Sequence, residues 1–233
     1  MSLRLSVVIV AFNEAPALRE VLAGLQRELP AAAGGAFEVI VVDDGSTDET
    51  STVARSAGVI VVQNCNRLGS GASRRQGARA TRGELVAWMD GDGTYPVEAL
   101  VAALRALGEA DQAIGVRSVD HGRLSGVRMA VKGILASFAA KLWRTPIPDL
   151  NTGLRVFRRT AMMSWIDELP DGFSCTTTAT LAALNHHQTL VFIPIDYRPR
   201  ASGTRSKFHP LWDTLRLMRA IWRMWRRRKQ HLV

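Results

Sequence analysis

The sequence predicts an α/β protein in which a doubly wound, mostly parallel sheet carries helices on both faces, followed by a basic amphipathic C-terminal helix. Three observations predict this fold. Short apolar runs alternate with helix-length segments through the first half of the chain. The runs are continuous and rich in β-branched residues, which is typical of strands buried on both faces. Acidic and turn-forming residues directly follow several runs, at the strand ends where such sheets bind ligands.

Five strands and four helices are expected in the first half of the chain. Pro16 suits the first turn of the first helix. The series Ser46-Thr47-Asp48-Glu49 has the spacing of a capping box and is expected to open the second helix. The expected strands are Leu5–Val10, Phe37–Val42, Val59–Gln63, Leu85–Met89 and Ala113–Val116. The expected helices are residues 16–28, 46–58, 69–80 and 96–107.

The second half is expected to add two strands and to end in a long helix. The strands are Leu154–Phe157 and Leu190–Ile195. The expected helices are residues 124–143, 160–167, 176–185 and 210–229. Apolar residues follow one stripe of the last helix at a spacing of three or four: Leu211, Leu215, Met218, Trp222 and Trp225. We therefore expect one folded domain over residues 1–207 and a basic tail over residues 208–233.

The composition excludes several classes of protein. Hydrophobic residues make up 47% and charged residues 22% of the 233 positions, which is typical of a globular domain rather than a disordered chain. Cys65 and Cys175 are the only cysteines, which excludes a disulfide scaffold and favours a reducing compartment. The chain has no signal-peptide pattern and no run of about 18 apolar residues, so we expect that it does not itself cross a membrane.

The positive charge is concentrated at the C-terminus. Nine basic residues and one acid lie between Arg205 and Val233, so this segment carries +8 of the formal net charge of +9. The remainder of the chain is nearly neutral. A nucleic-acid-binding domain usually spreads its charge over a folded face, so this distribution argues against such a role. It favours a surface anchor or an interaction arm.

Acidic and turn residues collect at three predicted strand ends, in the segments Asn13-Glu14, Asp43-Asp44 and Asp90-Gly91-Asp92. Each segment alone is compatible with an ordinary turn or helix cap, and we favour that interpretation for Asp48 and Glu49. Asp90 and Asp92 differ, because they leave a buried strand two residues apart with a glycine between them. Two carboxylates placed in this way suit a divalent cation that also holds a diphosphate.

These segments belong to longer motifs that resemble known enzymes. The runs Val7–Glu14, Val41–Asp48 and Met89–Pro96 resemble a family 2 glycosyltransferase with the GT-A fold. The motifs of the second half resemble the dolichyl-phosphate mannosyltransferase branch, which includes bacterial polyprenyl-phosphate sugar transferases. These motifs are Asp149–Arg155, Pro194–Tyr197 and Arg205–Lys207. The resemblance covers about residues 5–210 and implies that residues 1–207 form the catalytic domain.

The resemblance also implies roles for individual residues. The nucleotide-sugar site would contain Ala11, Phe12, Asn13, Glu14, Asp43, Asp44, Asp90, Gly91 and Asp92. The catalytic residues would be Asp90, Asp92, Arg117, Arg128 and Lys207, with both aspartates holding Mg²⁺ or Mn²⁺ on the donor diphosphate. The acceptor phosphate or a closing loop would involve Arg128, Lys132, Asp149, Arg155, Arg200, Ser206 and Lys207. Thr94 stands where mannosyltransferases often have Gln, so the donor stays open between GDP-mannose and a UDP-sugar.

The acceptor decides which further groups are needed. A phosphate acceptor is already ionised and needs an Arg or Lys to orient it, but no strong base. A hydroxyl acceptor requires a carboxylate base, for which Asp149 is the candidate. An equally good explanation is that Asp149 caps a helix. Arg155 is then explained as the salt-bridge partner of Asp149.

The main hypothesis is a metal-dependent, inverting glycosyltransferase that moves a sugar to a polyprenyl phosphate at the cytoplasmic membrane face. One alternative is the same donor chemistry on a hydroxyl of a soluble metabolite or glycan, and another is a nucleotide-binding scaffold that has lost catalysis. The tail would lie on an anionic membrane surface, pack on the body through the same apolar stripe, or dock onto a separate membrane-spanning subunit. A nucleic-acid partner is not expected.

Overall fold

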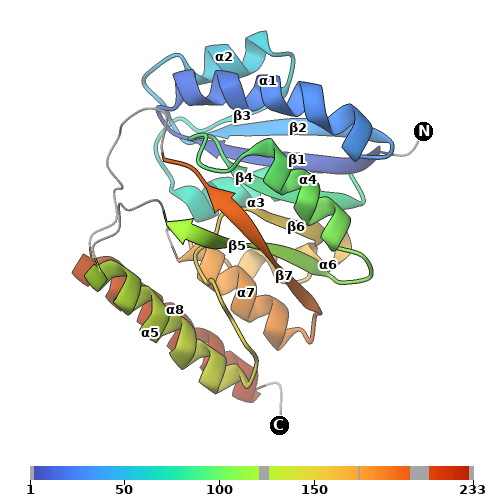
Figure 1. The fold of residues 1–233 in the computed structure, drawn as a ribbon. Helices are drawn as coiled ribbons and strands as arrows, with labels where there is room; N and C mark the ends of the chain where they lie inside the picture. Colours follow the sequence, from blue (N-terminus) through green and yellow to red (C-terminus); the bar gives the residue numbers. More distant parts are fainter. Residues whose placement is uncertain (1–2, 121–125, 173, 200–209, 231–233) are drawn as a thin grey trace.

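The protein is a seven-stranded α/β sheet covered by helices on both faces (Figure 1). The computed structural model describes residues 3–120, 126–172, 174–199 and 210–230. The strands follow the order β3-β2-β1-β4-β6-β5-β7. Only β6 runs antiparallel to its two neighbours, β4 and β5, and the other described pairs are parallel. The predicted fold class, a doubly wound and mostly parallel sheet, is therefore confirmed.

All seven expected strands are present. They are β1 Leu3–Ala11, β2 Ala36–Asp43, β3 Ile60–Gln63, β4 Leu85–Asp90, β5 Gln112–Asp120, β6 Arg155–Arg158 and β7 Leu190–Tyr197. The helices are α1 Ala15–Ala32, α2 Thr50–Ser56, α3 Ser70–Ala80, α4 Val97–Ala106, α5 Gly126–Trp143, α6 Arg159–Met163, α7 Cys175–Asn185 and α8 Pro210–Gln230. The helix expected over residues 160–167 is instead divided into α6 and a 3₁₀ turn, Ile166–Glu168.

Each face of the sheet has its own apolar core. On one face, α1 buries Leu18, Leu22, Leu25 and Leu29, whose spacing places them on one side of the helix, and α2 and α4 complete the layer. Full burial of each such side chain contributes about 1.5–3 kcal/mol. On the other face, the rings of Trp88, Phe157 and Trp165 pack edge to face beneath α7 and α8. These two layers fix the strands, and the carboxyl ends of the six strands that run parallel to one another meet along one edge.

The C-terminal helix α8 packs on the body through an apolar stripe that differs from the predicted one. Leu217, Ile221 and Met224 are at most 2% exposed and lie in the same core as α5 and α7. The predicted stripe points outward instead, since Met218 is 48% and Trp222 54% exposed. Packing on the body through that stripe, one of the three alternatives for the tail, is therefore not what the structure shows. Both stripes have helical spacing, and the structure buries the one that contains Leu217, Ile221 and Met224.

Polar contacts also hold α8 against the body. The Asn185 side chain accepts a hydrogen bond from Trp143 Nε1 of α5 and donates one to the carbonyl of Met224, both at 2.9 Å. Arg227 pairs with Glu168 at 2.9 Å. None of the helices in the described residues combines the length and the apolar character needed to span a membrane.

Candidate active site

The loops that follow β1 and β2 are bonded to each other at the carboxyl edge of the sheet. Asn13 has a φ of 56°, and this left-handed turn directs its side chain toward the second loop. Its Oδ1 accepts a hydrogen bond from Thr47 N at 2.8 Å, while its own N donates to Ser46 Oγ at 2.9 Å. Glu14 N donates to Thr50 Oγ1 at 3.0 Å. The first predicted ligand segment is therefore held rigidly beside the second.

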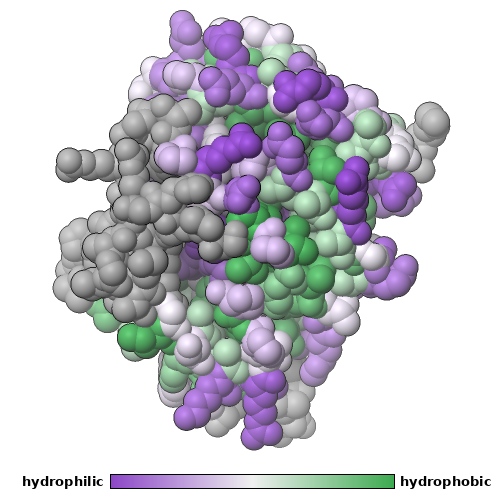
Figure 2. Space-filling model, viewed as in Figure 1, coloured by the Kyte–Doolittle hydropathy of each residue, from purple (hydrophilic) through white to green (hydrophobic). Residues whose placement is uncertain are grey.

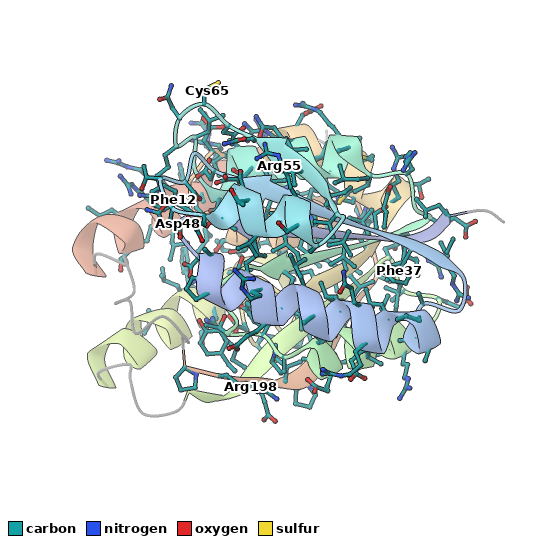
Figure 3. The ribbon with its side chains drawn as sticks, turned by 90° about the horizontal axis from the view of Figure 1, so that it is seen from above. Phe12, Phe37, Asp48, Arg55, Cys65 and Arg198 are labelled. Atoms are coloured by element: carbon teal, nitrogen blue, oxygen red, sulfur yellow. The ribbon has the colours of Figure 1, made fainter. Side chains whose placement is uncertain are left out.

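The predicted capping box over residues 46–49 is wrong, because those side chains join the two loops. Helix α2 begins only at Thr50 and has no side-chain cap. Asp48 accepts hydrogen bonds from Thr50 N at 3.0 Å and from Ala15 N, the start of α1, at 3.2 Å. Burial opposes ionisation of Asp48, but these bonds outweigh it and lower the pKa of its carboxyl. Figure 3 shows Asp48 beside Phe12, at the opposite end of the sheet from Phe37.

Asp43 and Asp44 lie at the same edge, with their carboxylates engaged by the protein. Asp43 is fully buried and accepts from Ser46 N at 2.9 Å and from the Ser51 hydroxyl. Asp44 accepts from Leu68 N and Gly69 N, each at 2.9 Å, and so fixes the entry to α3. The structure thus places both residues at the predicted edge, and their contacts to a nucleotide stay a prediction.

Asp90 ends β4 and forms an ion pair with a buried arginine. Arg74 of α3 is 3% exposed, and its Nη2 lies 2.6 Å from Asp90 Oδ1. Its Nη1 lies 3.4 Å from Cys175 Sγ. Burial opposes the charge of Arg74, but Cys175 and Asp90 raise its pKa. On the other side of Asp90, Gly153 leaves room for Oδ2, because a Cβ at this position would clash with that oxygen.

Asp92 is oriented by the turn that follows it. Its Oδ1 accepts from Thr94 N at 3.1 Å and from Thr94 Oγ1 at 2.7 Å. Gly93 has a φ of 73°, a conformation that glycine adopts without strain and that lets the chain fold back in this way. Thr94, which replaces the Gln of many mannosyltransferases, therefore acts here as a donor to Asp92. Its carbonyl accepts from Arg198 N at 2.8 Å, which brings the end of β7 to this turn.

The residues of this edge fit a divalent cation that is held jointly by protein and ligand. Asp90 and Asp92 supply hard carboxylate oxygens, the ligands preferred by Mg²⁺ and Mn²⁺. Asp90 also keeps 34% of its side chain exposed. The described residues contain no group of three or more His, Cys, Asp or Glu that could hold a metal ion by themselves. A cation here would therefore draw its remaining ligands from a bound diphosphate or from water.

Two tyrosines lie between the aspartates and a second ion pair. The rings of Tyr95 and Tyr197 pack edge to face with centroids 5.2 Å apart. Arg117 lies over the Tyr197 ring at 5.3 Å and pairs with both oxygens of Asp149, at 2.7 and 2.9 Å. Burial would lower the pKa of Arg117, but Asp149 outweighs it and leaves that pKa raised. Burial raises the pKa of both tyrosines, so they stay neutral hydrogen-bonding groups.

Arg155 is a structural residue in the core. It is fully buried and donates to Thr152 O at 3.1 Å, Thr180 Oγ1 at 2.9 Å and Thr176 O at 2.9 Å. Burial lowers its pKa to about 10, so it remains a cation at neutral pH. The prediction that Arg155 is the salt-bridge partner of Asp149 is wrong, since Arg117 occupies that position.

The family of the chain follows from its sequence. Residues 6–165 match the sequence profile of Glycosyl transferase family 2. The chain belongs to this family. The match spans the segment from β1 to α6, which includes the three loops and both aspartates described above. The predicted family and the predicted enzyme class, a glycosyltransferase, are therefore confirmed.

Relatives and solved structures agree with this assignment. The chain is 27% identical to Glycosyltransferase AglJ of Haloferax volcanii over 87% of its own length, but it spans only 65% of that relative. It is 28% identical to a Dolichyl-phosphate hexose transferase of the same organism over 86% of each chain. Glucosyl-3-phosphoglycerate synthase from Mycobacterium tuberculosis, solved with Mn²⁺ and UDP, shares the fold with a TM-score of 0.72 and 20% identity. That likeness covers 95% of this chain and 79% of the other.

Several predicted site residues of this family 2 glycosyltransferase lie outside the described part of the chain. These are Arg200, Ser206 and Lys207, together with the side chains of Arg128 and Lys132 on α5. Their roles stay predictions. Among the described residues, the structure brings Ala11, Asn13, Asp43, Asp90 and Asp92 to one edge of the sheet. Asp44 N donates to the carbonyl of Ala11 and Gly91 N to the carbonyl of Val10, which ties these three strand ends together.

Sequence reasoning missed the role of Arg74. The residue lies in a predicted helix among polar neighbours, where an arginine is usually solvated, so nothing in the local pattern marked it as buried. The signal that could have found it is the glycine spacing of α3. Gly71 leaves no room for a Cβ against Pro170 O, and this close approach of α3 to the segment before α7 encloses the guanidinium.

Proposed function

We propose that this glycosyltransferase moves a sugar from a nucleotide-sugar to a polyprenyl phosphate, with a divalent cation and with inversion at the anomeric carbon. The observation that carries the choice of acceptor is the state of Asp149. Both of its carboxylate oxygens accept hydrogen bonds from Arg117, and Oδ1 also accepts from Asn151 N at 2.9 Å. A carboxylate committed in this way is a poor general base. A phosphate acceptor needs no such base, because it is already ionised.

The chemistry follows from this arrangement. An oxygen of the acceptor phosphate forms a bond to the anomeric carbon as the bond to the donor diphosphate breaks, and the diphosphate leaves with the electron pair. Attack opposite to the leaving group inverts the configuration. When bound, the cation supplies positive charge to the leaving diphosphate. Asp90 and Asp92 would hold it, while Tyr95 and Tyr197 would separate it from Arg117, which would face the acceptor side.

Three findings support this proposal without fixing the donor. The chain resembles a transferase named for dolichyl phosphate. The fold is shared with an enzyme solved with Mn²⁺ and UDP. The end of β7, which precedes the segment with Arg200 and Lys207 in the sequence, is bonded to the Asp92 turn through Arg198 and Thr94. The proposal includes closure of this segment over the phosphates. The sugar would be either mannose from GDP-mannose or a hexose from a UDP-sugar.

The same proposal places the protein at the cytoplasmic face of a membrane, because a polyprenyl phosphate is held in a bilayer by its chain. The basic C-terminal segment is suited to an anionic membrane surface or to a separate membrane-spanning subunit.

The acceptor is tested by offering matched compounds of one chain length. A short, water-soluble prenyl phosphate and the corresponding prenol are each incubated with a nucleotide-sugar and Mn²⁺, and the glycosylated product is quantified. We expect transfer to the phosphate alone, with an inverted anomeric configuration by NMR. Asp149→Asn should leave most of the rate, whereas loss of a true general base would reduce it about 100- to 10,000-fold. Transfer to the prenol by the wild type, together with its loss in Asp149→Asn, would establish the hydroxyl alternative.

A further inference from the structure

We infer that α5 and α8 together form a surface that docks onto an anionic lipid bilayer, an inference that rests on the proposed function for its choice of partner. Five large apolar side chains are exposed on these two helices, and we call them the apolar ridge. They are Ile134 (67%), Phe138 (44%), Leu215 (37%), Met218 (48%) and Trp222 (54%). Elsewhere in the described chain, the exposed large apolar side chains are Ile60 and Leu68. The ridge is therefore a concentration of apolar surface and not a scatter of single residues.

The two helices that carry the ridge pack against each other. On α5, Ile134 and Phe138 are one turn apart, and Leu142 lies one further turn along the same side. The carbonyl of Leu142 accepts a hydrogen bond from Arg228 of α8 at 2.9 Å, so the two helices are joined near the end of α5. Figure 1 shows α5 in front of α8 and running in the same direction, the two helices are in contact, and Figure 2 shows apolar residues at the surface over α5.

Helix α8 carries the other half of the ridge. Trp225 lies three residues before Arg228 and is partly buried toward the core. Met218 and Trp222 follow the same side of α8 toward its start, and the Trp222 and Trp225 rings lie 5.0 Å apart. The two halves of the ridge thus lie on two helices that pack against each other. A tail acting alone would present only the α8 half.

Over residues 214–228 of α8, the charge around the ridge has a single sign. Residues 214–228 contain no acid, and their exposed charged side chains are Arg216, Arg219, Arg223, Arg226 and Arg227. An apolar stripe with Trp and flanking Arg is suited to the headgroup region of an anionic membrane. A second copy of this chain is a poor occupant, because a symmetric contact would bring these arginine rows near each other.

The position of the ridge suits the reaction. Figure 1 shows that α5 and α8 both begin on the side of the molecule where the parallel strands end, which is the edge that carries Asp90 and Asp92. A bilayer seated on the ridge would therefore lie beside the active site, within reach of a lipid-linked phosphate. Because α8 is packed into the core through Leu217, Ile221 and Met224, docking would fix the orientation of the whole protein and not tether it loosely.

The test measures co-sedimentation of the full chain with vesicles of phosphatidylcholine, with and without phosphatidylglycerol. Two ridge variants are compared, Ile134→Glu with Phe138→Glu on α5 and Met218→Glu with Trp222→Glu on α8. The control is Ile60→Glu, an apolar position of β3 outside the ridge that is 40% exposed. We expect binding to the anionic vesicles, at least about tenfold weaker partitioning for each ridge variant, and no change for the control. Far-UV circular dichroism and the melting temperature check that each variant is folded.

The outcomes separate the possible occupants. If only the α8 variant loses binding, the two-helix surface is wrong and the tail alone is the anchor. The full chain could instead fail to bind the vesicles and sediment as a dimer in the ultracentrifuge. If the ridge variants are then monomers, the occupant of the ridge is a second copy. If the full chain neither binds vesicles nor dimerises, the ridge is not a lipid surface and the inference is overturned. Transfer to a soluble prenyl phosphate is measured in parallel without vesicles. Its absence in the wild type would refute the proposed function, whatever the vesicle result.

Discussion

Arg74 determines how the Asp90 carboxylate is presented at the edge of the sheet. Removing one partner of a buried ion pair leaves an uncompensated charge and costs about 3–5 kcal/mol. Asp90 is partly exposed, so the larger share of that penalty belongs to the guanidinium, whose side chain is only 4% exposed. The pair therefore both stabilises α3 against β4 and fixes one oxygen of a residue that we expect to hold the cation. We regard Arg74 as a positioning residue.

Replacing Arg74 tests this role. Arg74→Lys keeps the charge but loses the planar fork, in which one nitrogen bonds Asp90 and the other Cys175. We expect a higher Mn²⁺ concentration for half-maximal transfer and a rate lowered about tenfold or more. The matched control is Arg79→Lys, on the same helix and exposed, where Arg79 pairs with Asp167. A fall in melting temperature without any change in the Mn²⁺ dependence would show that Arg74 is only structural.

At the scale of secondary-structure elements, Glu38 joins three segments of the sheet. Its Oε1 accepts from Ser6 Oγ of β1 at 2.6 Å and from Arg82 N at 2.8 Å, just before β4. Its Oε2 pairs with the Arg82 guanidinium at 2.8 Å. Burial would raise the pKa of Glu38, but these bonds outweigh it and lower that pKa. The ionised carboxylate thus helps to hold β2, β1 and β4 in register.

The stability contributed by Glu38 should depend on pH. A carboxyl with a lowered pKa in the folded state stabilises the protein above its unfolded pKa, about 4.3, and this contribution is lost as the pH falls through the folded value. We expect Glu38→Gln to lower the free energy of unfolding by about 1.5–3 kcal/mol at neutral pH. The difference from the wild type should shrink in acid, as measured by urea unfolding at several pH values. Glu28→Gln, an exposed control, should have little effect, and a pH-independent gap for Glu38→Gln would contradict the assignment.

Across the whole molecule, the sequence predicted the elements better than their partners. All seven strands were identifiable, most of them because they are continuous apolar runs. The insertion of β6 between β4 and β5 was not, because it depends on long-range pairing that leaves no local pattern. The same holds for α8, where Leu217 and Met218 both belong to stripes of helical spacing. Only the packing against α5 and α7 decides which stripe is buried.

In the candidate site, too, the positions of residues were easier to predict than their partners. The positions of Asn13, Asp43, Asp90 and Asp92 could be predicted, because the carboxyl ends of parallel strands meet at one edge. Their hydrogen-bond partners could not. Arg117, and not Arg155, pairs with Asp149, since β5 brings Arg117 to the edge while β6 carries Arg155 into the core.

The most direct test of the account is the rate of sugar transfer to a short prenyl phosphate as Mn²⁺ is titrated, in the wild type and in Asp92→Asn. Asp167→Asn, which alters an exposed aspartate far from the cation, serves as the control. We predict that wild-type transfer requires the cation and that Asp92→Asn lowers the rate about 100-fold or more, with an unchanged melting temperature. Full transfer by Asp92→Asn, or by the wild type in the presence of a chelator, would contradict a metal-assisted reaction at this edge of the sheet.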